Sequence, residues 1–252
     1  MMKQKMEEII IKNLSKKFRI GFKKEQSVLS YFISFFSGIE PKKEFWALKG
    51  ISFSVNSREN IGIIGKNGSG KTVLLKTIMG IYNLDKGEIK TNGNIVILSG
   101  VGLRSRLTLM DNIYLVSSIL GLSQKDIKRK FNSIVEFAGL QDFVNTKIYQ
   151  FSSGMRKRIA FSIIIHYIEH YKPDILLLDE IFAGGDEEFK NKSLKKLEEL
   201  MGKGTTFILV GHNLKLIEKY CDRVIWLDKG KIIKDGKPKE VIEAYVKFIK
   251  RG

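Results

Sequence analysis

The chain has 252 residues, of which 43% are hydrophobic and 28% charged, so it is expected to fold around a sizeable core rather than stay disordered. A single cysteine, Cys221, excludes an internal disulfide and fits a reducing compartment. The net charge of +17 suits nucleic acid, anionic lipid or nucleotide as a partner, or it reflects only a solvated lysine surface. No nucleic-acid-binding motif is present, so a nucleic acid partner is not expected.

The first third of the chain predicts strands and one glycine loop. Strands are expected at "EEIIIKNLSKKF" and "FWALKGISFSV", with an insert between them, from about Arg19 to Glu44, that contains a short helix. "NIGIIG" predicts a buried strand that runs into a loop before the helical segment "KTVLLKTIMGIY". "GEIKTNGNIVIL" alternates and breaks at Asn92-Gly93, which is typical of a hairpin.

The middle of the chain, about 108–171, loses this strand character and shows helical spacing in three segments. Ser123 and Asp126 resemble a capping box at the start of the second segment. Strands return at "DILLLDE", "TTFILVGH" and "RVIWLDKGKIIK", with helices at 186–201, 213–220 and 238–249. The pattern predicts one α/β domain over 1–252 that is interrupted by a helical lobe.

The sequence "GKNGSGKT" fits the pattern of a phosphate-binding loop and lies where that loop is needed, between a buried strand and a helix. Its glycines let backbone N–H groups close around the β-phosphate. Lys71 would supply charge to the β- and γ-phosphates, and Thr72 a hydroxyl to Mg²⁺. The predicted ATP-binding residues here are Gly65, Lys66, Asn67, Gly68, Ser69, Gly70, Lys71, Thr72 and Val73.

Two later strands end in polar side chains that suit the same chemistry. Asp179 and Glu180 follow the apolar run "ILLL", where Asp179 would hold Mg²⁺ through water and Glu180 would polarise the attacking water. His212 ends "VGH", within expected reach of the γ-phosphate. Two acids after a strand are otherwise more often a solvated loop or helix cap, but the phosphate loop favours the functional interpretation.

A second segment suited to phosphate, "FSSGMRKRIAFS", begins at Phe151. Two serines and a glycine precede an apolar helix whose first turns carry three basic residues, which gives hydroxyls, free N–H groups and positive potential. The simpler interpretation is an N-cap for that helix.

In this order, the phosphate loop, the helical lobe, "FSSGM", "LLLDE", "AGGD" and "VGH" resemble the nucleotide-binding subunit of an ABC transporter over nearly the whole chain. The resemblance implies a P-loop NTPase core of the ABC ATPase type with an antiparallel β subdomain. It also implies ATP and Mg²⁺ as ligands and ATP hydrolysis coupled to transport. Two copies would form a head-to-tail dimer in which Ser152, Ser153, Gly154 and Met155 cap the γ-phosphate of ATP held by the other copy.

Three further positions carry over from the resemblance. Asp186 matches the loop that links the two sites of the dimer, or simply caps the following helix. Phe18 matches the aromatic residue that stacks on adenine, although an aromatic at a strand end is otherwise core. The usual metal-contacting Gln or Glu is absent from "IVILSGVGLRSRLT", where Ser99 is the nearest and weaker candidate.

The insert, "SSGM" and "AGGD" together resemble the branch of the family that exports polysaccharides and teichoic acids as lipid-linked polymers. Another exported cargo (lipid, drug or peptide) is the alternative, and a nucleic-acid-binding ATPase a remote one. We expect a bare ATPase subunit at the cytoplasmic face of a bacterial or archaeal membrane, with the channel on a separate chain. No apolar run reaches the roughly 18 residues that a spanning helix needs.

The insert itself carries an apolar face flanked by lysines, in "GFKK", "SVLSYFISFFSGI" and "PKK". This composition suits the anionic headgroup layer of a membrane, so the insert is predicted to face the membrane and the channel partner. The alternative is that the same face packs against the core.

Overall fold

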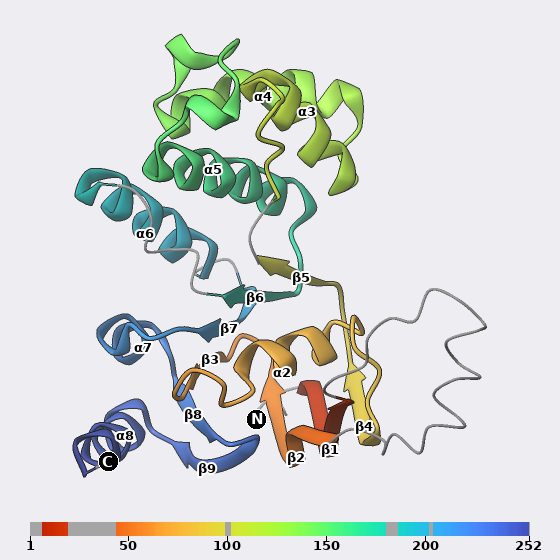
Figure 1. Cartoon of the computed structure of the whole chain (residues 1–252), viewed down its shortest axis with the longest axis vertical. Helices are drawn as coiled ribbons and strands as arrows, with labels where there is room; N and C mark the ends of the chain where they lie inside the picture. Colours follow the sequence, from red (N-terminus) through yellow and green to blue (C-terminus); the bar gives the residue numbers. More distant parts are fainter. Residues whose placement is uncertain (1–6, 20–43, 99–101, 180–185, 202–203, 252) are drawn as a thin grey trace, which may run out of the picture.

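A computed structural model describes residues 7–19, 44–98, 102–179, 186–201 and 204–251. Ser99, Glu180 and all of the predicted insert except its two end residues lie outside the described residues. Figure 1 shows a helical lobe at one end of the long axis of the molecule. A larger sheet runs from below this lobe to the other end, where a smaller sheet lies beside it.

The central sheet has six strands and is parallel except at one edge. Continuous apolar runs such as "ILLLD" favour this arrangement, because a parallel strand is covered on both faces. The exception is a hairpin joined by Lys229 and Gly230, whose positive φ values of 46° and 77° suit a type I′ turn. The strand order is β5 (Ile95–Leu98), β6 (Ile175–Asp179), β7 (Thr206–Val210), β3 (Asn60–Ile64), β8 (Arg223–Asp228) and β9 (Lys231–Gly236).

The smaller sheet is antiparallel, with β1 (Glu7–Arg19) between β2 (Glu44–Asn56) and β4 (Lys86–Thr91). Helix α2 (Lys71–Ile78) packs between the two sheets, and its Leu74 and Leu75 are fully buried. Alternate residues of β6 serve the two faces of the central sheet: Ile175 and Leu177 join this core, while Leu176 and Leu178 join the core of the helical lobe.

The predicted hairpin at Asn92-Gly93 is wrong. Strand β4 pairs with β1 in the small sheet, whereas β5 pairs with β6 in the central sheet, so the turn carries the chain from one sheet to the other. The backbone amide of Asn94 donates to Asp174 Oδ2 at 2.8 Å, which directs the chain toward β6. Gly93 has φ 104° and lies so close to Asp174 that a side chain would collide with it, which explains the glycine without a hairpin.

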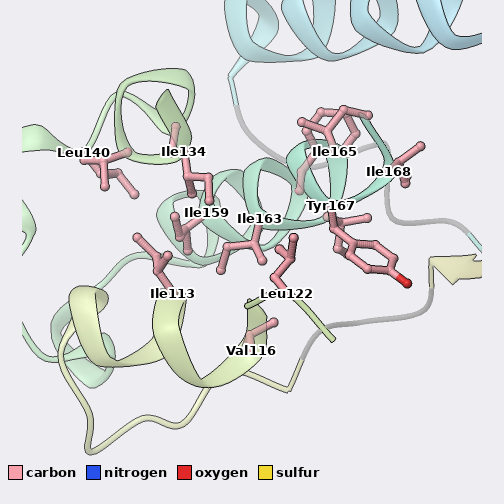
Figure 2. Close-up of a cluster of buried hydrophobic side chains, with 14 of the residues drawn as sticks. Ile113, Val116, Leu122, Ile134, Leu140, Ile159, Ile163, Ile165, Tyr167 and Ile168 are labelled. Atoms are coloured by element: carbon pink, nitrogen blue, oxygen red, sulfur yellow. The ribbon is translucent and has the colours of Figure 1, made fainter. Parts of the chain in front are cut away.

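The helical lobe consists of α3 (Leu109–Ile119), α4 (Gln124–Ala138) and α5 (Ser153–Tyr171), with short 3₁₀ turns at Gln141–Phe143 and Ile148–Gln150. Thr108 and Asp111 form a complete capping box at α3, and Ser123 Oγ accepts from the Asp126 amide at α4 as expected. Figure 2 shows the core between these helices, where Ile113, Ile134 and Ile163 converge with no exposed area.

Helices α6 (Glu187–Met201), α7 (Leu214–Tyr220) and α8 (Pro238–Arg251) complete the fold. Helices α7 and α8 pack with β8 in a third core cluster that includes Trp226 and Tyr245. The α/β class, the inserted helical lobe and the antiparallel sheet are all as predicted. Among the described residues, no helix has the length and apolar content needed to cross a membrane.

Candidate nucleotide-binding site

Three of the predicted site segments meet at one edge of the central sheet. Strand β7 lies between β6 and β3, with Asp179 opposite Val210 and Ile63 opposite the same residue on the other side. The glycine loop follows β3, Asp179 ends β6, and His212 lies two residues beyond β7. Carboxyl ends of neighbouring parallel strands are where α/β folds bind ligands, so the topology brings these segments together.

The loop between β3 and α2 has a backbone that only glycine can adopt without strain. Gly65, Gly68 and Gly70 have φ values of 154°, 78° and 108°. A Cβ on Gly65 would lie 2.1 Å from the Leu227 carbonyl oxygen, whereas one on Gly68 would meet open space. The first glycine therefore allows close packing on β8, and the second is exposed and free to approach a ligand.

Lys71 is the first residue of α2 and is buried despite its charge, with 7% of its surface exposed. Its ammonium donates to the carbonyl oxygens of Gly65 at 2.8 Å and Lys66 at 3.1 Å. A phosphate bound in the loop would lie beside this buried ammonium and would stabilise its charge. The position fits the role predicted for Lys71.

The start of α2 has the features of an anion site. Its N-cap, Gly70, provides no side-chain hydrogen bond, and its first turn contains no acidic residue. The first N–H groups of a helix lack intrahelical partners and carry the positive end of the dipole. The hydroxyl-bearing Thr72 is exposed at this end, and the Ser69 Oγ is buried without a hydrogen-bond partner. A phosphate would supply acceptors for these groups.

The same donor set fits a hydrated Mg²⁺ beside a phosphate. Thr72 is exposed at the start of α2, and Asp179 occupies the end of β6, so a hydroxyl and an acidic residue come from two elements that share one core cluster. Within the described residues, no group of three or more His, Cys, Asp and Glu side chains forms a metal site by itself. A cation here would depend on phosphate oxygens for part of its coordination.

The other two predicted nucleotide contacts, His212 and Phe18, differ in how exposed they are. His212 is exposed beyond β7. Phe18 is half-buried near the end of β1, where its ring meets the Tyr82 ring edge-on at 5.3 Å and the Lys16 ammonium lies 5.4 Å from its centre. No sequence pattern marks Tyr82 as the neighbour of Phe18, because only the fold brings these two residues together.

The second phosphate-suited segment is at the start of α5, in the helical lobe rather than beside α2 (Figure 1). Ser152 is the N-cap, and its hydroxyl oxygen accepts from the Met155 amide at 3.2 Å. Ser152 and Ser153 are both exposed, as are Arg156 and Lys157 in the first turns of the helix. The segment therefore has its own cap and a basic outer surface.

Asp186 forms a cap of the same kind at α6. Its Oδ1 accepts from the Phe189 amide at 2.8 Å, and its Oδ2 lies 3.8 Å from the guanidinium of Arg158 on α5. The amide hydrogen bond is the main cause of a lowered pKa at Asp186, with Arg158 adding to it. The capping interpretation is thus realised in the structure, and Arg158, which sequence reasoning missed, joins the two segments.

Sequence reasoning also missed the support beneath the loop. The Gly230 amide donates to the Ser69 carbonyl at 2.9 Å, and the Lys49 amide donates to the Gly230 carbonyl at 2.8 Å. The turn between β8 and β9 therefore links the phosphate loop to β2. The "DKG" turn signal in the sequence marks a tight turn but not its partner.

A glycine loop between a parallel strand and a helix, with an acid at the end of a nearby strand, defines a P-loop nucleotide-binding fold. The profile of the ABC transporter family matches residues 48–183, and the chain belongs to this family. The chain is similar to a dimeric ATP-binding cassette solved in a post-hydrolysis state with ADP and Pi, with a TM-score of 0.71 at 20% identity over 91% of this chain and 98% of that one.

Curated relatives at higher identity bear the names of export proteins. The teichoic acids export ATP-binding protein TagH of Lactococcus lactis is 39% identical over 84% of this chain and 45% of its own length. TagH of Listeria innocua is 35% identical over 96% and 71%, and the O-antigen export system ATP-binding protein RfbB of Myxococcus xanthus is 35% identical over 97% and 56%. The chain thus spans about half the length of several relatives.

Proposed function

We propose that the chain is the ATP-hydrolysing subunit of an ABC transporter that exports a lipid-linked polysaccharide, such as a teichoic acid or an O-antigen. The observation that carries the ATP-binding part is the phosphate loop, where a buried Lys71 and uncapped helix N–H groups converge. The cargo is supported by the names of the relatives described above.

Different residues of the chain are proposed to contact different parts of ATP. The N–H groups of the loop and of the start of α2 hold the β-phosphate, while Lys71 places charge on the β- and γ-phosphates. Thr72 and, through water, Asp179 would hold Mg²⁺, which would supply charge neutralisation to the phosphates. His212, two residues beyond β7, would reach the γ-phosphate, and Phe18 would stack on the adenine.

Glu180 is proposed as the residue that polarises the attacking water. It follows Asp179 at the carboxyl end of β6, which is the same sheet edge as the phosphate loop. A carboxylate there can accept a proton from water as its oxygen attacks the γ-phosphate. Ser99 would follow β5, the strand next to β6, and is proposed as a weak metal contact in place of the usual Gln or Glu.

Two copies are proposed to form a head-to-tail dimer with two ATP molecules between them. Ser152, Ser153, Gly154 and Met155 of one copy would contact the γ-phosphate held by the other, and Asp186 would link the two sites. The exposed serines and the basic first turns of α5 support an outward-facing anion contact. A separate transmembrane subunit and the cytoplasmic membrane surface, which the 19–44 insert would face, are the other proposed partners.

The hydrolysis proposal is tested with the purified chain and two variants. Lys71→Ala should abolish detectable ATP binding, because the loop loses its buried cation. Glu180→Gln should keep ATP binding but lower turnover by roughly 10²-fold or more, because an amide cannot accept the proton. Glu187→Gln, in the exposed first turn of α6, is the matched control and should hydrolyse ATP at the wild-type rate.

Wild-type turnover in Glu180→Gln would contradict its role, and ATP binding by Lys71→Ala would contradict the role of the loop. The cargo requires a separate measurement. The membrane protein that copurifies with the tagged chain should be reconstituted with it in liposomes, and the ATPase rate compared with and without a lipid-linked polymer. Stimulation by a drug or peptide but not by polymer would contradict polysaccharide export.

A further inference from the structure

Helix α8 and the phosphate loop are connected by a contact between two side chains, Phe248 and Lys66. The ammonium of Lys66, the second residue of the loop, lies 5.0 Å from the centre of the Phe248 ring. A cation at that distance over an aromatic face is attracted by the ring's quadrupole. The pair thus connects the end of the chain's last described helix to the proposed nucleotide site.

Phe248 is itself held by the strand that supports the loop. Its ring lies 5.0 Å from Trp226 of β8, and Trp226 also meets Tyr245 of α8 edge-on at 5.5 Å. Trp226 is opposite Ile64, the last residue of β3 before the loop begins. This aromatic cluster fixes Phe248 relative to the start of the loop.

The backbone of Lys66 takes part in the loop's internal hydrogen bonds. Its carbonyl oxygen accepts from the Lys71 ammonium at 3.1 Å and from the Ser69 amide at 3.1 Å. A shift of Lys66 therefore moves the carbonyl that orients the phosphate-binding lysine. Lys66 is exposed, and the contact of its ammonium with Phe248 gives α8 a way to restrain its position.

We infer that Phe248 is a positioning residue for the phosphate loop, and that α8 sets the chain's affinity for ATP through the Phe248–Lys66 pair. This inference rests on the proposed ATP binding. Phe248 itself is not proposed to touch the nucleotide. It holds Lys66, and Lys66 holds Lys71 in the arrangement that receives the phosphates.

A double-mutant cycle on ATP affinity tests this inference. Phe248→Leu keeps apolar packing against Trp226 but removes the ring, and Lys66→Met keeps the side-chain length but removes the charge. Phe248→Leu should weaken the ATP Kd about two- to fivefold, the range expected of an exposed cation–π pair. In the Lys66→Met background, Phe248→Leu should have no further effect.

Two more variants separate positioning from packing. Phe248→Tyr restores an aromatic face and should return the wild-type Kd. Ile249→Ala, on the same helix and with the same 41% exposure as Phe248, should leave the Kd unchanged. Affinity is measured by calorimetry with a non-hydrolysed ATP analogue, and the melting temperature of each variant is recorded beside it.

Additive effects of the two substitutions on Kd, or a wild-type Kd for Phe248→Leu, would overturn the inference. A lower melting temperature without a change in Kd would assign Phe248 to packing alone. Absence of binding by the wild-type chain would instead contradict the proposed function, so the two failures are distinguishable.

Discussion

Helices α2 and α5 each begin at a segment proposed to contact phosphate, but the two segments are built differently. At α2 the backbone closes around a buried lysine, and the N-cap glycine has no side chain with which to cap the helix N–H groups. At α5 the Ser152 hydroxyl caps the helix, and both serines are exposed. The first site is therefore organised within one chain but incomplete without an anion, whereas the second is complete as a helix end and faces outward.

This difference agrees with two separate roles in a dimer, in which α2 of one copy holds ATP and α5 of the other copy contacts it. A site that holds ATP gains from donors, such as the buried Ser69 hydroxyl, that the phosphates can satisfy. A helix end that contacts ATP held by the other copy must be stable before the two copies associate. A helix that is capped by its own side chain has that stability. The contrast can be tested by breaking each helix start in turn.

Gly65→Ala should have the largest effect of these changes. The added Cβ would lie 2.1 Å from a backbone oxygen on β8, so either the loop or the strand must shift. We expect a loss of roughly 2–4 kcal/mol in the free energy of unfolding, together with loss of ATP binding. Urea denaturation measures the free energy of unfolding, and calorimetry measures ATP binding.

Gly68→Ala is the matched control, because it has positive φ but open space around its Cβ. It should cost only the local backbone strain, about 1 kcal/mol. Equal destabilisation by the two alanines would show that close packing on β8 does not explain Gly65.

Ser152→Ala should have a smaller effect on the free energy of unfolding, because it changes only the cap of α5. Removing the N-cap hydroxyl should cost about 1 kcal/mol in unfolding free energy. Ser153→Ala, one residue inside the helix, should cost nothing, because alanine is the better helix former there. Chemical denaturation of both variants gives the comparison, and equal losses would contradict the assignment of Ser152 as the N-cap.

The smallest expected effect concerns acid stability at α6. The folded-state pKa of Asp186 is lowered below its ordinary value of 3.8, chiefly by the Phe189 amide and also by Arg158. Its stabilising contribution is therefore complete above that ordinary pKa and is lost as the pH falls through the lower folded-state value. Asp186→Asn keeps an acceptor but does not titrate, so melting temperature should fall less steeply below about pH 4. If the melting temperature of Asp186→Asn falls below pH 4 as steeply as that of the wild type, the link between Asp186 ionisation and stability is contradicted.

Local patterns predicted the elements that depend on local sequence. The phosphate loop, the "ILLLD" strand and the three lobe helices follow from glycine spacing and apolar periodicity, and the caps at Ser123 and Ser152 follow from residue type. The order of motifs then identified the family, which the profile match over 48–183 confirms.

Pairings between distant segments were not predictable in the same way. Asn92-Gly93 gives the same turn signal whether its flanking strands pair with each other or enter different sheets, and only the contact with Asp174 separates the two cases. The Lys66–Phe248 and Arg158–Asp186 pairs likewise join residues that no spacing rule connects. The roles of Glu180 and Ser99 stay predictions.

We propose that the α2 segment of one copy and the α5 segment of another complete one ATP site. The direct measurement mixes Lys71→Ala protein with Ser153→Arg protein, both carrying Glu180→Gln to slow hydrolysis, and Glu180→Gln alone serves as the positive control. Each variant alone should form no ATP-bound dimer in light scattering. Their mixture should recover an ATP-dependent dimer, because the mixed pair retains one intact loop facing one intact serine segment. If the serines served the loop of their own chain, mixing would recover nothing, and that result would contradict the account.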